Sequence, residues 1–198
     1  MFIIKNNENL IIMKTNLFPA IKLTAITLIF FAGVYTIIIW GIAQLAPNHG
    51  NGQVVMQNGK KYYANVGQTF TEDKYFNSRP SAVDYNAAGS GGSNKAPSNP
   101  EYLQTVQARI DTFLVHNPGV KKQDVPVELV TASGSGLDPD ISPNAALIQL
   151  KRVAKTRNVS EQNIQKLIEE NTEAPLLGLL GPAKVNVLKL NMALDQVK

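Results

Sequence analysis

Residues 23–46 read LTAITLIFFAGVYTIIIWGIAQLA, a run of 24 positions without a charged side chain. The hydrocarbon core of a bilayer is about 30 Å thick, and roughly 20 residues of α-helix cross it. The polar side chains of the run are those of three threonines and Gln44, and a threonine hydroxyl can bond to a carbonyl of its own helix. Trp40 and Gln44 near one end suit the interface between lipid and water. The run therefore predicts a transmembrane helix.

Two alternatives to a membrane anchor fit this run less well. A cleaved signal peptide has an apolar region of about 7–15 residues followed by small residues, whereas here bulky residues continue to Trp40. A core helix of a soluble domain would show a polar face at helical spacing, and no such face interrupts residues 23–46. We therefore expect an anchor that stays in the membrane.

The lysines around the run predict its orientation. Three lysines precede it within residues 1–22, and the next lysines after it are Lys60 and Lys61. Cytoplasmic flanks of membrane helices carry an excess of Lys and Arg. We therefore expect residues 1–22 in the cytoplasm and residues 47–198 outside it, as one extracytoplasmic domain. Met13 is an alternative start of the chain.

The composition excludes several classes of site. The chain has no cysteine, so it holds no disulfide, zinc–thiolate site or cysteine nucleophile. Its net charge is +4 without a long basic run, which argues against a nucleic-acid surface. Residues 144–170 could pass for a helix-turn-helix, but Glu161, Glu169 and Glu170 on its second helix would repel phosphates. We expect no nucleic-acid partner.

Capping signals predict the helices of the outer domain. Asn99-Pro100 and Ser142-Pro143 each place a capping side chain before a proline, and Ser160 precedes Glu161. The expected buried faces are Leu103, Val106, Ile110 and Phe113 on the first helix; Ala146, Leu147, Leu150, Val153 and Ala154 on the second; and Ile164, Leu167 and Ile168 on the third. We expect these helices to end near Asn117, near Asn158 and before residue 174.

The remaining segments predict short strands and long loops. We expect one short strand in each of residues 47–60 and 60–70 and a strand at 124–133. Residues 184–195 predict either a closing strand or a strand followed by a short helix. Residues 75–100 are rich in Gly, Ser and Pro and read as a loop or linker, and residues 174–182 as an apolar turn. Because helices and strands do not alternate regularly, the prediction is a single mixed α+β domain behind one N-terminal transmembrane helix.

TASGSGLDPDISPNAA, residues 131–146, is the stretch that most resembles a catalytic motif. A nucleophile elbow needs glycine two positions before and after its serine, but Ser135 has Ser133 and Leu137 there. The histidines available as a base are His49 and His116, and the latter lies where a histidine pairs with a helix C-terminus. The stretch therefore does not predict acyl-transfer chemistry.

Phosphate and metal motifs are incomplete as well. The glycines of residues 88–95 and 134–139 lack the spacing of known phosphate loops, although glycine-rich backbone can form an anion nest. Asp138, Asp140 and Ser142 stand at the spacing of the first three calcium-loop ligands, but Gln149 occupies the position of the closing glutamate. Asp140 and Ser142 are better explained as an acidic residue and a capping residue before a helix than as calcium ligands.

Several sequence blocks, in this order, closely resemble the KdpC family. They are YFNSRPSA (75–82), SGGSN (90–94), NP (99–100), VP (125–126), LVTASGSGLDP (129–139), ISP (141–143), AA (145–146), RVAKTR (152–157), LG (177–178) and VNVLKLNMALD (185–195). This family is the small accessory subunit of the Kdp potassium-transporting ATPase of bacterial inner membranes. The resemblance implies a single-pass inner-membrane protein with its domain in the periplasm.

The resemblance also implies partners. They are a channel-like potassium-binding subunit (KdpA-like), a P-type ATPase subunit (KdpB-like) and a small KdpF-like peptide, all within a lipid bilayer. This chain lacks the Asp-Lys-Thr-Gly-Thr phosphorylation motif and the Thr-Val-Gly-Tyr-Gly filter. The family implies a non-catalytic subunit that stabilises assembly and raises the ATP affinity of its partner. The complex uses ATP, magnesium and potassium, but we expect this chain to hold no cofactor itself.

Two features depart from the family. The family usually has histidine where this chain has Asp140, and residues 47–74 match poorly. An outer domain can change ATP affinity only indirectly, by favouring one state of the complex. An exported enzyme or ligand-binding module unrelated to potassium transport stays the alternative.

We hypothesise that two glycine- and serine-rich loops form the partner interface or brace each other. They carry the candidate site residues Arg79, Pro80, Ser81, Ser90, Gly91, Gly92, Ser93 and Asn94 in the first loop, and Ser133, Gly134, Ser135, Gly136, Asp138 and Asp140 in the second. Ala32 and Gly33 would let a partner helix approach the membrane segment closely.

Overall fold

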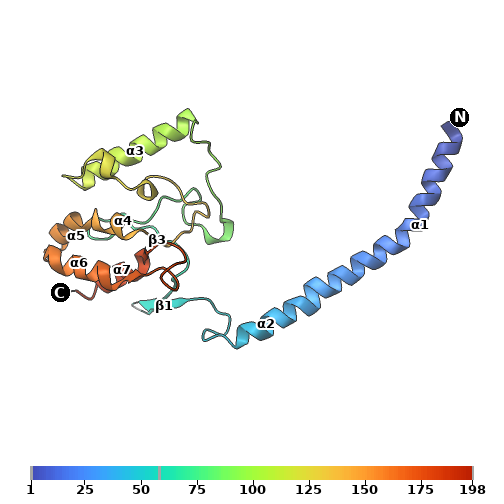
Figure 1. Cartoon of the computed structure of the whole chain (residues 1–198), viewed down its shortest axis with the longest axis horizontal. Coiled ribbons are helices and arrows are strands. Elements are labelled where there is room, and N and C mark those ends of the chain that lie inside the picture. Colours follow the sequence, from blue (N-terminus) through green and yellow to red (C-terminus); the bar gives the residue numbers. More distant parts are fainter. Residues whose placement is uncertain (1, 58, 198) are drawn as a thin grey trace. The chain divides into compact units, whose positions relative to one another are not determined.

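The computed structural model describes residues 2–57 and 59–197, with side chains in the first helix described from Thr15 onward. The chain divides into two compact units, Met1–Gly52 and Gln53–Lys198. The first unit is the helical N-terminal segment, and the second holds every strand and the remaining helices (Figure 1).

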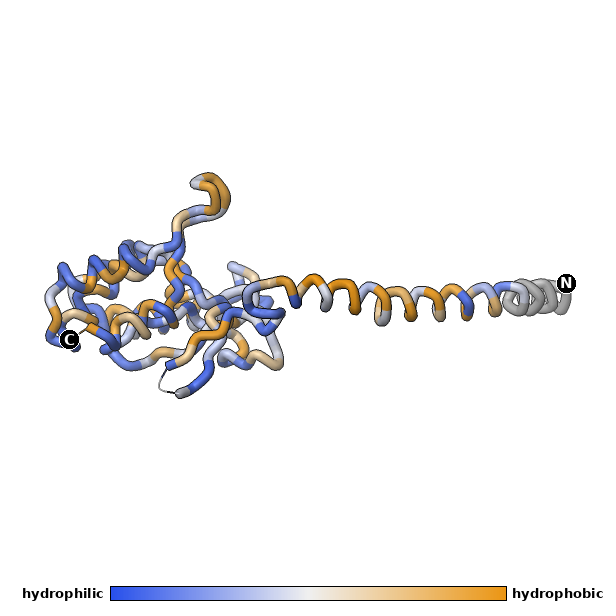
Figure 2. Tube along the Cα trace, turned by 90° about the horizontal axis from the view of Figure 1, so that it is seen from below, coloured by the Kyte–Doolittle hydropathy of each residue, from blue (hydrophilic) through white to orange (hydrophobic). Residues whose placement is uncertain are grey.

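The first unit is a long helix. It consists of α1 (Phe2–Leu28), a π-helical stretch η1 (Ile29–Tyr35) and α2 (Thr36–Gln44). Within it, Thr15–Gln44 is the one helix of the described residues that is long and apolar enough to cross a membrane. Figure 2 shows much of this segment in orange, the colour of hydrophobic residues. The hydroxyl of Thr27 donates to the carbonyls of Leu23 and Thr24, at 2.9 and 3.0 Å. As expected, its hydroxyl bonds to its own helix.

Turns follow the end of α2. The amides of Leu45 and Ala46 donate to the carbonyls of Ile42 and Ala43, and the His49 amide donates to the Ala46 carbonyl. The His49 ring also lies with Nδ1 3.0 Å from the Gln44 carbonyl oxygen. This stretch is therefore folded back on the helix end.

Two small antiparallel sheets form in the second unit. The strands β1 (Val54–Gln57) and β2 (Lys60–Tyr63) pair as a hairpin, which confirms the two short strands expected there. The strands β3 (Asp140–Ile141), β4 (Thr172–Glu173) and β5 (Lys184–Asn186) form a second sheet in the order β3-β5-β4. Val185 of β5 lies between Ile141 and Thr172.

Five α-helices and three short 3₁₀ helices complete the part of the second unit that the structure describes. The α-helices are α3 (Pro100–His116), α4 (Pro143–Leu147), α5 (Leu150–Arg157), α6 (Glu161–Glu170) and α7 (Val187–Leu194); the 3₁₀ helices are η2 (Ala87–Gly89), η3 (Lys122–Asp124) and η4 (Val127–Leu129). The expected caps are confirmed: Asn99, Ser142 and Ser160 accept from backbone amides in the first turns of α3, α4 and α6. Asn158 ends α5 with a left-handed φ of 55°.

The hydrophobic core lies among α4, α5, α6, α7 and β5 (Figure 1). The expected inner face of α6 is confirmed, because Ile164, Leu167 and Ile168 are buried. Leu147 was expected to be buried and is 43 % exposed. The single helix expected from residue 143 to 157 is divided into α4, which ends at Leu147, and α5, which begins at Leu150.

Two further expectations differ from the structure. The strand predicted at 124–133 is wrong, because η4 and a turn occupy its centre. Pro126 has no amide to donate to a ladder, and the amides of Val130 and Thr131 both donate to the Val127 carbonyl instead. On α3, Phe113 is buried but Leu103 is 52 % exposed, so the expected stripe is buried only towards its C-terminal end.

Candidate functional site

The two loops proposed as a site lie against each other. We call residues 77–94 the first loop and residues 131–143 the second loop. The amide of Gly91 and the hydroxyl of Ser90 both donate to the carbonyl of Ser135, each at 2.9 Å. The amide of Ser133 donates in turn to the Pro80 carbonyl at 3.1 Å. Three hydrogen bonds therefore join residues of the two loops that are more than forty positions apart in sequence.

Glycine is required where the loops touch most closely. Gly136 has a φ of +67°, and a Cβ there would lie 2.6 Å from Val83 Cγ2 and 2.8 Å from the Gly91 carbonyl oxygen. A Cβ on Gly92 would lie 3.0 Å from the carbonyl oxygen of Gly134. Real Cβ atoms rarely or never make such close contacts, so Gly136 and Gly92 serve the pairing of the loops.

An ion pair closes the other end of this contact. Arg79 Nη1 lies 2.6 Å from Asp138 Oδ2, and both side chains are about three-quarters buried or slightly less. The hydroxyl of Tyr85 donates to the Arg79 carbonyl, and burial raises the pKa of this phenol. Asp138 Oδ1 accepts from the amide of Asp140 at 3.0 Å. The Asp138 carboxylate is thereby committed to two protein donors.

The first loop holds an uncommon backbone conformation. Asp84 and Tyr85 are consecutive residues with positive φ, at 50° and 58°. The Ser81 hydroxyl oxygen accepts from the amides of Val83 and Tyr85, at 3.1 and 2.9 Å. Non-glycine residues with left-handed backbone dihedrals are strained and persist only where their surroundings fix them. Ser81 fixes these two residues, together with the hydrogen bond from the Tyr85 hydroxyl to the Arg79 carbonyl.

Asp140 takes part in a charge cluster on the second sheet. Lys184 Nζ lies 2.7 Å from Asp140 Oδ2 and 3.6 Å from Glu173 Oε2, and Lys189 Nζ lies 3.2 Å from Glu173 Oε1. The hydrogen bond to Asp140 raises the pKa of Lys184 despite partial burial. The hydrogen bond from Lys189 lowers the pKa of Glu173. The cluster therefore ties β3, β4, β5 and α7 together by charge.

This cluster predicts a modest acid sensitivity. A carboxylate whose pKa is lowered by folding stabilises the protein above its unfolded value, about 4.3, and loses that contribution as pH falls through the folded pKa. Replacing Glu173 by glutamine should remove that contribution and cost about 0.5–1 kcal/mol at neutral pH. The difference in stability is measured from the thermal unfolding midpoints of the wild type and the Glu173→Gln variant between neutral and acid pH. Glu169→Gln is the control, because the Glu169 carboxylate accepts a hydrogen bond from the neutral side chain of Gln165. An equal loss of stability in that variant would contradict the role given to the charge of Glu173.

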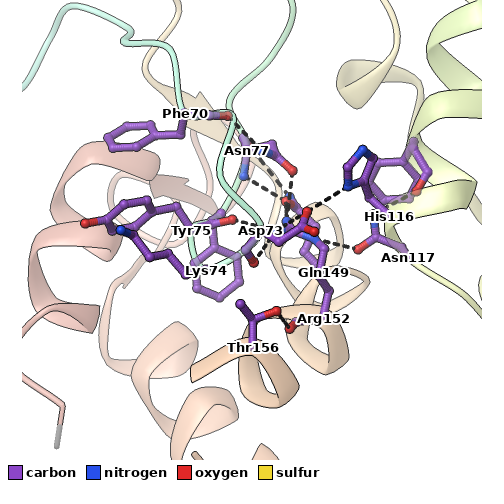
Figure 3. A network of polar contacts seen from close by, with 12 residues as sticks. Phe70, Asp73, Lys74, Tyr75, Asn77, His116, Asn117, Gln149, Arg152 and Thr156 are labelled. Atoms are coloured by element: carbon purple, nitrogen blue, oxygen red, sulfur yellow. Dashed lines mark hydrogen bonds and ion pairs between the residues drawn. The ribbon is translucent and has the colours of Figure 1, made fainter. Parts of the chain in front are cut away.

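A buried arginine positions the start of the first loop (Figure 3). Arg152 of α5 is 6 % exposed. Its guanidinium donates to the carbonyls of Asp73 and Tyr75, at 2.6 and 2.9 Å. It also donates to Asn117 Oδ1 at 3.0 Å, and to Asn77 Oδ1 and Gln149 Oε1, at 2.8 and 2.7 Å. Burial lowers its pKa, and the charge of Asp73 opposes that shift.

Two buried amides complete this attachment. Asn191 of α7 accepts from the Phe76 amide at 2.9 Å and donates to the Phe76 carbonyl at 3.0 Å. Gln149, which is fully buried, accepts from the Asn77 amide at 2.8 Å. Residues 75–100 are therefore a loop, as expected, but their first part is fixed to the core and is not a flexible linker.

The sequence motifs did not reveal this polar centre. Arg152 and Asn191 stood inside family blocks, but their type and spacing predict only a basic helix face and an amphipathic helix. An arginine between Leu150, Val153 and Ala154 on the buried face of a helix was the available signal, because charged residues are rarely buried unless they are paired. His116 does lie in the last turn of α3, as expected, with Nδ1 2.8 Å from Asp73 Oδ1.

The other candidate residues lie at the exposed side of the loop pair. Ser90, Gly134 and Ser135 are exposed, and Gly92 and Ser93 are half-buried beside them. Asn94 is exposed with a φ of 51°. The Ser135 hydroxyl oxygen accepts from the Leu137 amide at 3.0 Å. The arrangement offers a shaped polar surface rather than a nucleophile paired with a base.

Comparisons with known proteins assign the family. A family model described as "K+-transporting ATPase, c chain" matches residues 17–196. A potassium-transporting ATPase KdpC subunit of Flavobacterium johnsoniae is 56 % identical over 184 residues, which cover 92 % of this chain and 99 % of that protein. The KdpC subunit of Bacteroides fragilis is 53 % identical over 190 residues, covering 94 % and 99 %. That of Caldanaerobacter subterraneus is 46 % identical over 181 residues, covering 90 % and 94 %.

These matches confirm the resemblance seen in the sequence and do not favour an unrelated exported enzyme or binding module. The relatives are named as a subunit of the transporter and not as its catalytic unit, so this chain is an accessory part of a larger ATPase. The chain belongs to the KdpC family of potassium-transporting ATPase subunits.

Proposed function

We propose that this chain is a single-pass subunit of the bacterial inner membrane, with residues 1–22 in the cytoplasm and the second unit outside. Its helix packs in the bilayer against the channel-like, KdpA-like subunit. Its paired loops dock on the outer face of that subunit and so stabilise the assembly that includes the KdpB-like ATPase subunit and a KdpF-like peptide. The apolar run of Thr15–Gln44 and the lysines before it support this topology.

The observation that carries the proposal is the rigidity of the loop pair. Hydrogen bonds, an ion pair and closely packed glycines hold its backbone in one shape before any partner binds. A preorganised surface loses little conformational entropy on association, so more of its contact energy appears as affinity. Ser90, Gly134 and Ser135 present this surface to the outside.

The geometry supports an indirect effect on ATP affinity. An anion nest needs free amides pointing to one place, whereas the amides of Gly91, Ser133 and Gly136 donate to carbonyls within the loop pair. On the proposed topology ATP and this surface lie on opposite sides of the membrane. The subunit then acts on ATP by favouring one conformation of the whole complex.

Removal of this chain tests the proposed role. The remaining subunits are expressed without it, and assembly and potassium-dependent ATP hydrolysis are measured after mild solubilisation. We expect loss of the assembled complex, with activity restored when the chain is supplied again. Normal assembly with lost hydrolysis would instead assign a regulatory role, and normal values of both would overturn the proposal.

A further inference from the structure

A turn of exposed leucines projects from the second unit. Leu176, Leu177, Leu179 and Leu180 are 67, 83, 87 and 61 % exposed. Figure 2 shows this segment as an orange tip away from the body of the unit. We call residues 175–181 the leucine turn. Large apolar side chains gathered on one exposed projection mark a surface that is covered in the working protein.

The leucine turn is already folded for burial. The amides of Leu176 and Leu180 each donate to the other's carbonyl, at 3.0 and 2.9 Å, and those of Gly178 and Leu179 donate to Pro175 and Leu176. Leu177 and Gly178 have φ values of 56° and 74°, which close the turn. Backbone groups that enter an apolar phase must be satisfied internally, and four amides of this turn are satisfied in this way.

Hydrogen bonds link the strand that follows the turn to the point where the chain enters the second unit. The leucine turn leads directly into β5, which runs from Lys184 to Asn186. Asn186 Nδ2 donates to the Ala64 carbonyl at 2.7 Å, and the Ala64 amide donates to the carbonyl of Gln53 at 2.8 Å. Gln53 is the first residue of the unit, so two hydrogen bonds, the three residues of β5 and residues 182 and 183 separate the chain entry from the base of the turn.

The connection to the membrane helix is short. Residues 45–51 form turns whose amides donate back towards the end of α2, and the Asn51 amide donates to the Asn48 carbonyl. Gly52 alone then precedes Gln53. An extended residue adds at most about 3.5 Å, so the chain entry cannot move far from the end of the helix that ends at Gln44.

We propose that the leucine turn inserts into the surface of the lipid bilayer beside the membrane helix. The proposal rests on the proposed function only in that Thr15–Gln44 spans the membrane. A bilayer is then an apolar phase to which the short connection tethers the second unit. Insertion gives the second unit a second attachment to the membrane and limits its rotation about the connection, which presents the paired loops in a fixed direction.

The charges around the turn favour lipid over a charged protein surface. Residues 174–183 carry no charge. Glu173 and Lys184, which flank them, lie 3.6 Å apart and also pair with Lys189 and Asp140. The turn therefore offers apolar area without a net charge at its base, which suits a zwitterionic lipid surface.

The experiment uses the full chain in vesicles of phosphatidylcholine, with and without bromine on the upper acyl chains. The protein has no native cysteine, so a single Leu177→Cys carries an environment-sensitive fluorophore. We expect its emission to shift to the blue in vesicles and to be quenched by the brominated lipid. Adding Leu179→Ser should reduce both effects, because that side chain is 87 % exposed and its loss leaves the fold intact.

Two reference positions separate the possible failures. Ile38→Cys in the helix reports insertion of the membrane segment, and Lys166→Cys, at an exposed position of α6, should show neither effect. Quenching at Ile38 without quenching at Leu177 would overturn the leucine-turn proposal and leave the membrane helix standing. A blue shift at Leu177 that appears only when the other transporter subunits are present would also overturn it, because the turn would then dock on protein.

Discussion

Replacing Arg152 by methionine is expected to lower the free energy of unfolding by about 3–5 kcal/mol, the usual cost of removing one partner from a buried charged network. The change leaves the carbonyls of Asp73 and Tyr75 and the side-chain oxygens of Asn77 and Asn117 without their donor. Buried acceptors without donors are costly. Urea unfolding of the purified full chain in detergent, followed by circular dichroism, measures the difference.

Two variants test the cause of this loss. Arg152→Lys keeps the charge but cannot supply five directed donors, so it should fall between the wild type and Arg152→Met. Lys155→Met removes a cation from an exposed position of the same helix and should change stability by less than about 0.5 kcal/mol. Equal effects of the methionine variants at 152 and 155 would contradict a special role for the buried guanidinium.

Replacing Gly136 by alanine is expected to destabilise the second unit by about 2–4 kcal/mol, the sum of left-handed backbone strain and overpacking. The new methyl group would lie 2.6 Å from Val83 Cγ2 and 2.8 Å from the Gly91 carbonyl oxygen, at a φ of +67°. Because these contacts hold the two loops together, assembly with the other subunits should also fall. Thermal unfolding and the yield of co-purified complex give the two readings.

Gly134 is the matched control in the same loop. A Cβ at Gly134 meets nothing within 4 Å, and its φ is not left-handed. Gly134→Ala should therefore leave stability within about 0.5 kcal/mol of the wild type. If it destabilised the domain as much as Gly136→Ala, the close packing at Gly136 would not be the reason for that glycine.

Local signals in the sequence were sufficient for much of the fold. The caps at Asn99, Ser142 and Ser160 are covalently close to the amides they bind, so short-range rules predict them. Residues 184–194 form β5 and α7, which is one of the two alternatives that the sequence left open there. The strand expected around Pro126 failed because the pattern of apolar residues there also fits 3₁₀ turns, and the proline decides between them.

The tertiary part of the site could not be predicted from one sequence. The hydrogen bond between Ser90 and Ser135 joins positions 45 residues apart, and Arg79 reaches Asp138 across 59. No local rule brings such residues together. The sequence indicated that both loops were constrained, and the structure shows that they constrain each other. Asp140 likewise gains its role only from Lys184, 44 residues later, which β-sheet pairing brings alongside.

The most direct test of the central claim is the accessibility of one cysteine at Ser90, introduced into this cysteine-free chain and read by mass on this subunit. The Gly91 amide keeps its bond to Ser135 when the serine hydroxyl is lost, so the loop pair stays formed. We expect a membrane-impermeant reagent to label this cysteine from the outside when the chain is alone. In the assembled transporter the cysteine should be strongly protected. Lys166→Cys should be labelled in both cases. Equal labelling of the Ser90 position with and without the partner subunits, or labelling from the cytoplasmic side only, would contradict the central claim.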